Sequence, residues 1–314
     1  MIIIDWISPP DHRNFNRALF SALELNNSKC IVFSKNLMIP EIQGELLPHG
    51  ASRFGQAIEI FRLLVKYRQS QVLLLTYDVA FLPIALILKR NLLVWEHNTT
   101  PEKEDWLKGF WQRILFKGAT RLAQFPGQKR RLLDLKQNVK YIGSPIFPSQ
   151  PIHSKVADQR DIPVYAAPSF RADLSYLADF LPVLGDCKII VKNAAQIIDG
   201  IDSPFIIPVD WIDFTYLGIP LSGILITVNS EIRGSFWLNE AIANNIPIII
   251  TNGLARNIFK ETFPDYPFCD LTLLSEPKSR KNLFPNSGFD TTNYVRDHNM
   301  LLKERFLSVM ELAF

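Results

Sequence analysis

The chain alternates repeatedly between short runs of apolar residues and longer segments with helical apolar spacing. The runs include MIIID at residues 1–5 and LLVWE at 92–96 in the first half, and KIIVK at 188–192 and GILITV at 223–228 in the second. Strands that are apolar at every position, rather than at every second one, are typical of parallel sheets covered by helices on both faces. The sequence therefore predicts an α/β protein with doubly wound, Rossmann-like parallel sheets.

The alternation continues along the whole chain. Further strands are predicted at residues 30–34, 71–75, 120–124, 139–142, 164–168, 204–209 and 247–251. Helices are predicted at residues 13–25, 56–68, 79–89, 106–117, 129–135, 173–184, 236–243 and 294–312. In the helix at 56–68, the side chains of Ile58, Phe61, Leu64 and Val65 recur at helical spacing, and we expect them to form its buried stripe.

A proline-rich stretch divides the alternation into two halves. Residues 143–163 read GSPIFPSQPIHSKVADQRDIP and have no apolar periodicity. We predict a first domain over residues 1–150, a linker over 151–163, a second domain over 164–293 and a terminal helix over 294–314. Ligands of doubly wound sheets bind at the carboxyl ends of the strands, so two such domains facing a cleft predict a site in that cleft.

The predicted domains differ in charge. Lys and Arg outnumber Asp and Glu by 20 to 12 in residues 1–150, whereas the acidic residues outnumber the basic ones by 19 to 14 in residues 151–314. A net charge of +3 for the whole chain conceals this difference. A basic half joined to an acidic half indicates two domains with different partners.

Several classes of protein are excluded by what the sequence lacks. The cysteines Cys30, Cys187 and Cys269 lie far apart and form no CxxC pair, so we expect neither disulfides nor a zinc site, and a reducing, cytoplasmic location. The first residues, MIIIDW, enter an apolar run without a basic segment or a small-residue cleavage site, so we expect no secretory signal. The apolar run at 72–88 contains Asp78 and Pro83, and a strand followed by a buried helix explains it better than a membrane span. Motifs of P-loop NTPases, dinucleotide dehydrogenases, zincins and serine hydrolases are also missing.

The stretch SEIRGSFWLNEAIANNIPIIIT, residues 230–251, is the strongest candidate for a binding segment. A polar loop with Gly234 and Ser235 leads into a helix, whose free N–H groups and partial positive charge suit a phosphate. Glu240 lies one to two turns further on, where a carboxylate could accept hydrogen bonds from the diol of a sugar. Spacing alone equally allows Glu240 to be an ordinary surface residue of the helix.

This segment resembles the donor-binding segment of GT-B glycosyltransferases of the large group 1 (GT4-like) type. Asn239-Glu240-Ala241 and Asn245-Ile246-Pro247-Ile248 match the second half of that family's pattern. The resemblance implies that Glu240 holds the ribose of a nucleotide-diphosphate sugar, with Asn239 beside it. The family's first glutamate falls on Ile232 here. Either Glu231 reaches the sugar through a loop adjustment, or Ser235 and backbone amides take that role.

The segment LLVWEHNTTPEKEDW, residues 92–106, carries a second resemblance to the same family. A strand that ends at a histidine is similar to the one whose histidine touches the donor sugar, which implies that His97 and Asn98 face the cleft. The alternative is an exposed loop histidine.

Four further residues are candidates for catalysis or phosphate binding. In the loop after the first strand, Asp11 and His12 could act as a general base, and Asp11 alternatively caps the next helix. In the second domain, Arg171 and Lys192 follow or end predicted strands. Similar enzymes place an Arg and a Lys near these points to neutralise the leaving diphosphate. The alternative is a pair of solvated surface cations.

A basic and aromatic segment lies between residues 106 and 131. It carries seven basic residues, Arg121 among them, and no acid. The candidates for a surface that contacts anionic lipid or the acceptor are Trp106, Lys108, Phe110, Trp111, Arg113 and Lys117. A core-facing stripe with a solvated basic face is the alternative. No nucleic-acid-binding motif accompanies the segment.

Together these features predict a GT-B glycosyltransferase that moves a sugar from a nucleotide-diphosphate sugar to a saccharide or lipid-linked acceptor in surface polysaccharide or glycolipid synthesis. The second domain would bind the donor and the first the acceptor, with peripheral contact to the inner face of the cell membrane. We expect no cofactor and no metal, because no Asp-x-Asp pair is present. The alternatives are a nucleotide-sugar epimerase of the same fold and a catalytically silent subunit that supports a partner transferase.

Overall fold

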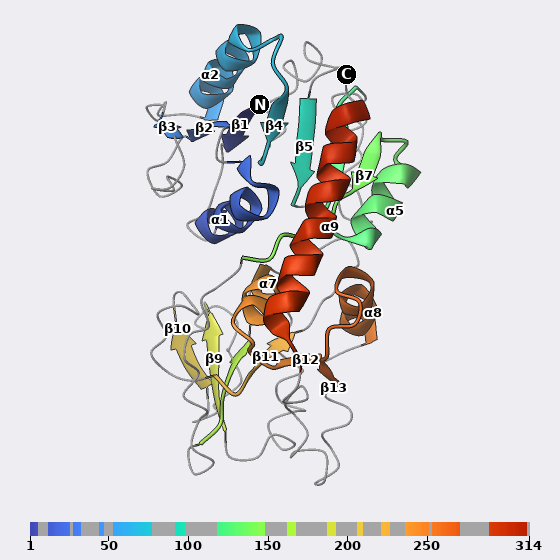
Figure 1. The fold of residues 1–314 in the computed structure, drawn as a ribbon. Helices are drawn as coiled ribbons and strands as arrows, with labels where there is room; N and C mark the ends of the chain where they lie inside the picture. The colour runs from blue at the N-terminus through green and yellow to red at the C-terminus, as the bar shows by residue number, and fades with distance from the viewer. Residues whose placement is uncertain are drawn as a thin grey trace. The chain divides into compact units, whose positions relative to one another are not determined.

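The computed structural model describes residues 1–5, 12–25, 28–32, 44–46, 53–76, 92–97, 118–147, 162–167, 187–192, 206–209, 221–226, 236–250, 253–270 and 289–312 (Figure 1). The chain divides into two compact units. The first unit comprises Met1–Phe147 and Asp297–Phe314, and the second comprises Pro148–Arg296.

The first unit contains a seven-stranded sheet in which every pair of neighbours is parallel. In spatial order its strands are β3 (Gly44–Leu46), β2 (Lys29–Val32), β1 (Ile2–Asp5), β4 (Val72–Leu74), β5 (Leu92–Glu96), β6 (Thr120–Ala123) and β7 (Val139–Tyr141). The order reverses between β1 and β4, which makes the sheet doubly wound. This confirms the parallel, Rossmann-like architecture that the apolar runs predict.

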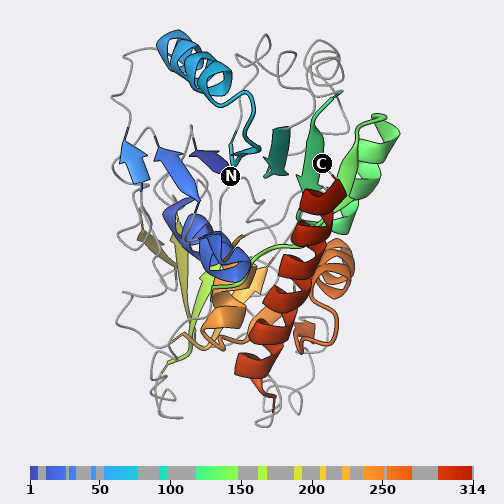
Figure 2. The ribbon, with the colours of Figure 1, turned by 45° about the horizontal axis from the view of Figure 1, so that its top comes forward.

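Helices cover this sheet on opposite faces. Helix α1 (His12–Leu23) and helix α2 (Arg53–Lys66) lie on either side of the strands β1 and β2 (Figures 1 and 2). Helix α5 (Pro126–Asp134) connects β6 to β7. Successive residues of a strand point to opposite faces, so a strand covered on both faces has to be apolar throughout. In β1, Ile2, Ile3 and Ile4 are accordingly all buried.

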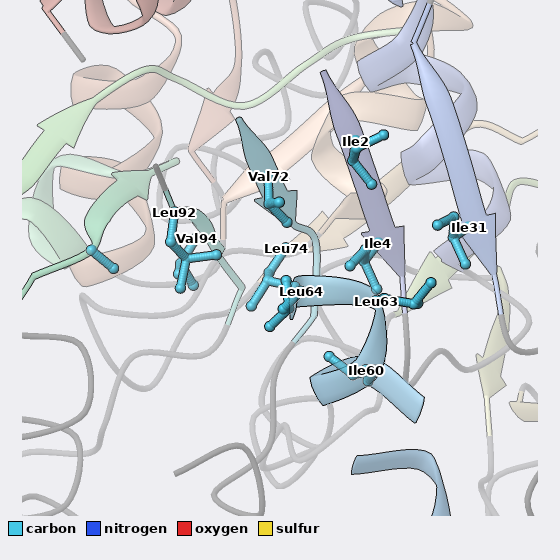
Figure 3. Close-up of a cluster of buried hydrophobic side chains, with 11 residues drawn as sticks. Ile2, Ile4, Ile31, Ile60, Leu63, Leu64, Val72, Leu74, Leu92 and Val94 are labelled. Atoms are coloured by element: carbon cyan, nitrogen blue, oxygen red, sulfur yellow. The ribbon is translucent and has the colours of Figure 1, made fainter. Parts of the chain in front are cut away.

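The buried face of α2 differs from the predicted one. Figure 3 shows three α2 side chains, Ile60, Leu63 and Leu64, beside the isoleucines, leucines and valines of four strands. The predicted stripe is correct for Leu64 but wrong for its other members, because Ile58, Phe61 and Val65 are 39%, 38% and 43% exposed. Apolar residues occupy so much of the circumference of this helix that helical spacing fits more than one stripe.

The second unit contains a six-stranded sheet that is also parallel throughout. Its strands, in spatial order, are β10 (Ile206–Val209), β9 (Lys188–Lys192), β8 (Val164–Ala167), β11 (Gly223–Ile226), β12 (Ile248–Ile250) and β13 (Cys269–Asp270). Helix α7 (Phe236–Ala243) links β11 to β12, and helix α8 (Gly253–Thr262) links β12 to β13. The strand order reverses between β8 and β11, so this sheet is doubly wound as well.

The predicted elements that fall within the described residues are all present, and three others were not predicted. Strand β3 reads Gly-Glu-Leu and strand β13 reads Cys-Asp, so neither forms a recognisable apolar run. Helix α8 carries a detectable signal, since its buried residues Ala255, Ile258, Phe259 and Thr262 recur at helical spacing. The helices predicted at 79–89, 106–117 and 173–184 lie outside the described residues.

The terminal helix α9 (Thr291–Leu312) belongs to both units, because the division of the chain falls between Arg296 and Asp297. Asp290 caps its start by accepting a hydrogen bond from the backbone N–H of Asn293 at 2.9 Å. Within the first unit, the side chain of Asn299 binds both backbone groups of Ile146. No helix in the described part of the chain combines the length and apolarity that a membrane crossing needs.

A buried histidine of α9 predicts how stability depends on pH. His298 Nε2 donates to the backbone oxygen of Ser144 over 2.9 Å. Burial of the ring lowers the pKa of His298 below its usual 6.5; the hydrogen bond to Ser144 opposes this shift, and the charge of Arg305 adds to it. As the pH falls through 6.5, the unfolded chain therefore binds this proton before the folded chain does, and the free energy of unfolding decreases.

We expect His298→Gln to remove this dependence while its amide keeps a donor for Ser144. Urea unfolding of both proteins between pH 8 and pH 5 measures it. Below pH 6.5 the curve of the variant should be flatter by up to about 1.4 kcal/mol per pH unit, the limiting slope for one proton. Parallel curves would contradict the prediction.

Candidate functional site

In the first unit, polar side chains follow neighbouring strands at the points where these strands end. Asp5 is the last residue of β1, Thr76 lies just beyond β4, and His97 directly follows β5. Gln124 directly follows β6, and Ser144 lies shortly after β7. Because the strands are parallel, their carboxyl ends share one edge of the sheet, which is where doubly wound sheets bind ligands. This edge is the candidate site of the first unit.

His97 is held on several sides at this edge. The ring of Phe15 on α1 meets the imidazole edge to face, with 4.5 Å between ring centroids. Gln124 Nε2 lies 3.2 Å from His97 Nδ1. Gln128 Nε2 donates to the backbone oxygen of His97 over 3.4 Å. The residue is half-buried. It directly follows β5, as the sequence predicts, whereas its contact with a sugar stays a prediction.

The residue before His97 forms a buried ion pair. Glu96 and Arg121 are both fully buried, and Arg121 Nε donates to Glu96 Oε2 over 2.9 Å, with a second bond from Nη2 to the same oxygen. Arg121, one of the seven basic residues of the segment 106–131, is therefore not a surface residue. Arg121 lies within β6, between β5 and β7 in a covered sheet, where a charge is tolerated only with a partner.

Asp5 is a buried carboxylate at the same edge that the sequence analysis did not single out. Asn16 Nδ2 donates to its Oδ2 over 2.6 Å, and Thr76 Oγ1 donates to its Oδ1 over 2.8 Å. Burial, and secondarily the negative charge of Asp5, raises the pKa of the Cys30 thiol to about 12. A charged residue that ends an otherwise apolar strand was a detectable signal. Asp11, by contrast, lies outside the described residues.

In the second unit, α7 presents part of the predicted donor-binding segment. Asn239, Ala241 and Ile242 are buried, and Glu240 between them is half-buried. The helix ends in a hydrogen-bonded turn in which Asn245, with φ of 53°, donates its N–H to Ile242 and the next N–H reaches Ala241. An asparagine in this left-handed conformation is a usual way to end a helix. The turn leads directly into β12 and fixes α7 against the sheet.

Of the remaining predicted site residues, two belong to described elements. Lys192 ends β9 and His12 begins α1, as far as their backbones show. The other candidates lie outside the described residues and stay predictions: Asn98, Arg171, Glu231, Gly234, Ser235, Trp106, Lys108, Phe110, Trp111, Arg113 and Lys117. Among the described side chains, His, Cys, Asp and Glu form no group of three or more that could hold a metal ion.

The chain has two Rossmann-like units with doubly wound parallel sheets, and its last helix is shared between them. This is the architecture of the GT-B fold. Solved structures of GT-B proteins match the chain over nearly its whole length. Alr3699/HepE from Anabaena, solved with UDP and glucose, matches with a TM-score of 0.72 at 11% identity, covering 99% of both chains. WaaG, a glycosyltransferase of lipopolysaccharide biosynthesis, matches with a TM-score of 0.60 at 12% identity, covering 97% of this chain and 95% of WaaG.

The fold also occurs in a related class of enzyme. A putative UDP-N-acetylglucosamine 2-epimerase from Listeria monocytogenes matches with a TM-score of 0.54 at 12% identity, covering 99% of this chain and 95% of the epimerase. No protein-family model and no curated protein sequence matches the chain. The chain thus has the fold of GT-B glycosyltransferases, at identities that establish the fold alone.

Proposed function

We propose that the protein is a metal-independent glycosyltransferase, of hexosyltransferase type, that moves a sugar from a nucleotide-diphosphate sugar to a saccharide or lipid-linked acceptor. The observation that carries the proposal is the placement of Glu240. It lies half-buried on α7, between buried neighbours, in the segment that resembles the donor-binding segment of GT-B glycosyltransferases. The Anabaena protein of the same fold was solved with UDP and glucose, which supports a nucleotide-sugar donor.

In this proposal the second unit binds the donor. The carboxylate of Glu240 accepts hydrogen bonds from the two ribose hydroxyls, which a carboxylate can do with its two oxygens. The diphosphate lies at the start of α7, where backbone N–H groups and the helix dipole favour negative charge. Lys192 and Arg171 supply fixed cations that stabilise the charge developing on the leaving diphosphate. Fixed cations in these positions make a metal ion unnecessary for that step.

The first unit would take the acceptor. Its candidate edge offers His97 to the sugar being transferred and the buried carboxylate of Asp5 nearby along the same edge. The excess of basic residues in the first 150 positions suits an acceptor that carries phosphate, such as a lipid-linked saccharide. Synthesis of surface polysaccharide or glycolipid is the pathway class that this acceptor implies, and WaaG, of the same fold, is involved in lipopolysaccharide biosynthesis.

Nucleotide binding tests the donor site. UDP-, GDP-, dTDP- and CMP-sugars are screened by thermal shift and calorimetry against the intact protein, Glu240→Ala and Glu261→Ala. We expect one nucleotide class to bind, and Glu240→Ala to weaken it about 10- to 100-fold, the equivalent of about 1.5–3 kcal/mol for hydrogen bonds to a charged group.

Glu261 is the matched control, because it is an exposed glutamate on α8 of the same unit. Its substitution should leave the affinity unchanged. If no nucleotide sugar binds, the transferase proposal fails and a silent subunit of the same fold becomes the better description. If binding occurs but Glu240→Ala binds equally well, the donor site lies elsewhere.

An epimerase is the second candidate, because the Listeria protein shares the fold. An epimerase changes the sugar of its nucleotide substrate without an acceptor. Proton NMR of each binding nucleotide sugar, incubated with the protein alone, distinguishes the two. A new epimer would establish the epimerase, whereas an unchanged sugar favours transfer.

A further inference from the structure

The side chain of Gln124 touches His97 in a way that determines where the imidazole carries its proton. We infer that Gln124 is a positioning residue, which holds His97 as the neutral tautomer with hydrogen on Nε2 and a lone pair on Nδ1. The functional meaning of this inference rests on the proposed function, in which His97 meets the substrate. The chemistry of the ring itself follows from the contacts around Gln124.

The orientation of the Gln124 amide is fixed by its neighbours. Its Nε2 lies 2.9 Å from the backbone oxygen of Glu96, which can only accept a hydrogen bond. The opposite orientation would place two acceptor oxygens against each other at this distance. The Gln124 Oε1 accepts from Ser144 Oγ over 3.1 Å, and a hydroxyl suits either orientation. The carbonyl of Glu96 therefore decides that the NH₂ group faces His97.

The second hydrogen of that NH₂ group points to the imidazole. One hydrogen is donated to the backbone oxygen of Glu96, and the other is donated to His97 Nδ1 at 3.2 Å. An amide nitrogen is a donor only, so Nδ1 has to present its lone pair. In a neutral ring the proton then resides on Nε2. Protonation of both nitrogens would set Nδ1–H against the amide hydrogens.

Gln124 is itself held rigidly. It is buried, and its backbone N–H donates to Gln128 Oε1 over 2.9 Å, as does that of Phe125 over 3.2 Å. The side chain of Gln128 also contacts His97, since its Nε2 donates to the backbone oxygen of the histidine. Gln124, which precedes α5, thus contacts the ring of His97, and Gln128, in the first turn of α5, contacts its main chain. The nearest charge along the chain, Glu96, is neutralised by its ion pair with Arg121.

This tautomer gives His97 a defined role in the proposed transferase. An Nε2 that carries hydrogen donates a hydrogen bond to an oxygen, such as a sugar hydroxyl or a phosphate oxygen. It cannot at the same time remove a proton from the acceptor, which requires a lone pair at that atom. His97 is therefore a donor to the substrate, and the general base has to be another group.

Nuclear magnetic resonance of the intact chain tests the inference. Two-bond nitrogen–proton correlation spectra of ¹⁵N-histidine-labelled protein distinguish protonated from unprotonated ring nitrogens. The chain has 5 histidines, and the signals of His97 are those lost in His97→Asn. We expect an unprotonated Nδ1 and a protonated Nε2 at neutral pH, without any nucleotide present.

The variant Gln124→Glu reverses the contact. A carboxylate of the same shape keeps the bond from Ser144, loses the bond to the backbone oxygen of Glu96 and can only accept from His97. The proton should therefore move to Nδ1, or both nitrogens should be protonated. The ratio of Nδ1-protonated to Nδ1-unprotonated ring should rise about tenfold or more, as expected when a charged acceptor replaces a neutral donor. Gln137→Glu, which changes another buried glutamine of this unit, should leave the His97 signals unchanged.

Two results would overturn the inference. The first is an Nδ1–H tautomer in the unmodified protein, which decides the matter even if Gln124→Glu does not fold. The second is a folded Gln124→Glu protein with unaltered His97 signals. Since neither spectrum involves a nucleotide sugar, failure of donor binding would refute the proposed function and leave the tautomer standing.

Discussion

Arg121→Met is expected to lower the free energy of unfolding by about 3–5 kcal/mol, because it leaves the carboxylate of Glu96 buried without its counter-charge. Both side chains are fully buried, and two guanidinium nitrogens donate to one oxygen of Glu96. Methionine fills much of the volume of the arginine stem, so the loss reports the unpaired charge rather than a cavity. Urea unfolding at neutral pH measures the change.

Two further variants isolate the effect of the charge. Glu96→Leu combined with Arg121→Met removes both charges, and its stability should return to within about 1–2 kcal/mol of the original, since apolar replacement of a buried ion pair is commonly tolerated. Lys140→Met, at an exposed position on the adjacent strand β7, is the matched control and should change stability by less than about 0.5 kcal/mol. Equal losses in the single and double variants would contradict the prediction.

The sheets were predictable from the sequence because their signal is local. Runs such as MIIID, LLVWE and KIIVK are apolar at successive positions, and only a strand covered on both faces requires that pattern. The face of α2 was not predictable in the same way. Ile60 and Phe61 are adjacent and both apolar, and only the packing of the helix on the strands decides that Ile60 is buried and Phe61 is not.

The candidate site was predictable only in part, for a similar reason. His97 stands out because it follows an apolar strand, and Glu240 because its segment resembles a known one. Gln124 carries no such signal, since its contact with His97 spans 27 positions of the chain. That contact exists because β6 lies beside β5 in the sheet and α5 begins directly after β6. Side-chain pairs created by strand order require the assembled sheet.

The second large effect is expected where α9 joins the first unit. The side-chain amide of Asn299 accepts a hydrogen bond from the backbone N–H of Ile146 over 3.0 Å and donates to its backbone oxygen over 2.5 Å. Both residues are buried, and 153 positions of the chain separate them. Asn299→Ala deprives two buried backbone groups of their partners at about 1–3 kcal/mol each, so we expect a loss of about 2–6 kcal/mol in urea unfolding.

Aspartate and alanine act differently at position 299, because the Asn299 amide both accepts from and donates to the backbone of Ile146. Asn299→Asp keeps the acceptor for the N–H of Ile146 and sets a carboxylate oxygen against its carbonyl, so it should destabilise the protein at least as much as alanine does at neutral pH. Asn257→Ala, at an exposed position on α8, removes the same amide without a buried partner and should change stability by less than about 0.5 kcal/mol. If Asn299→Ala were as mild as Asn257→Ala, the attachment of α9 would rest on its apolar residues Leu302, Phe306 and Val309 instead, all of which are buried.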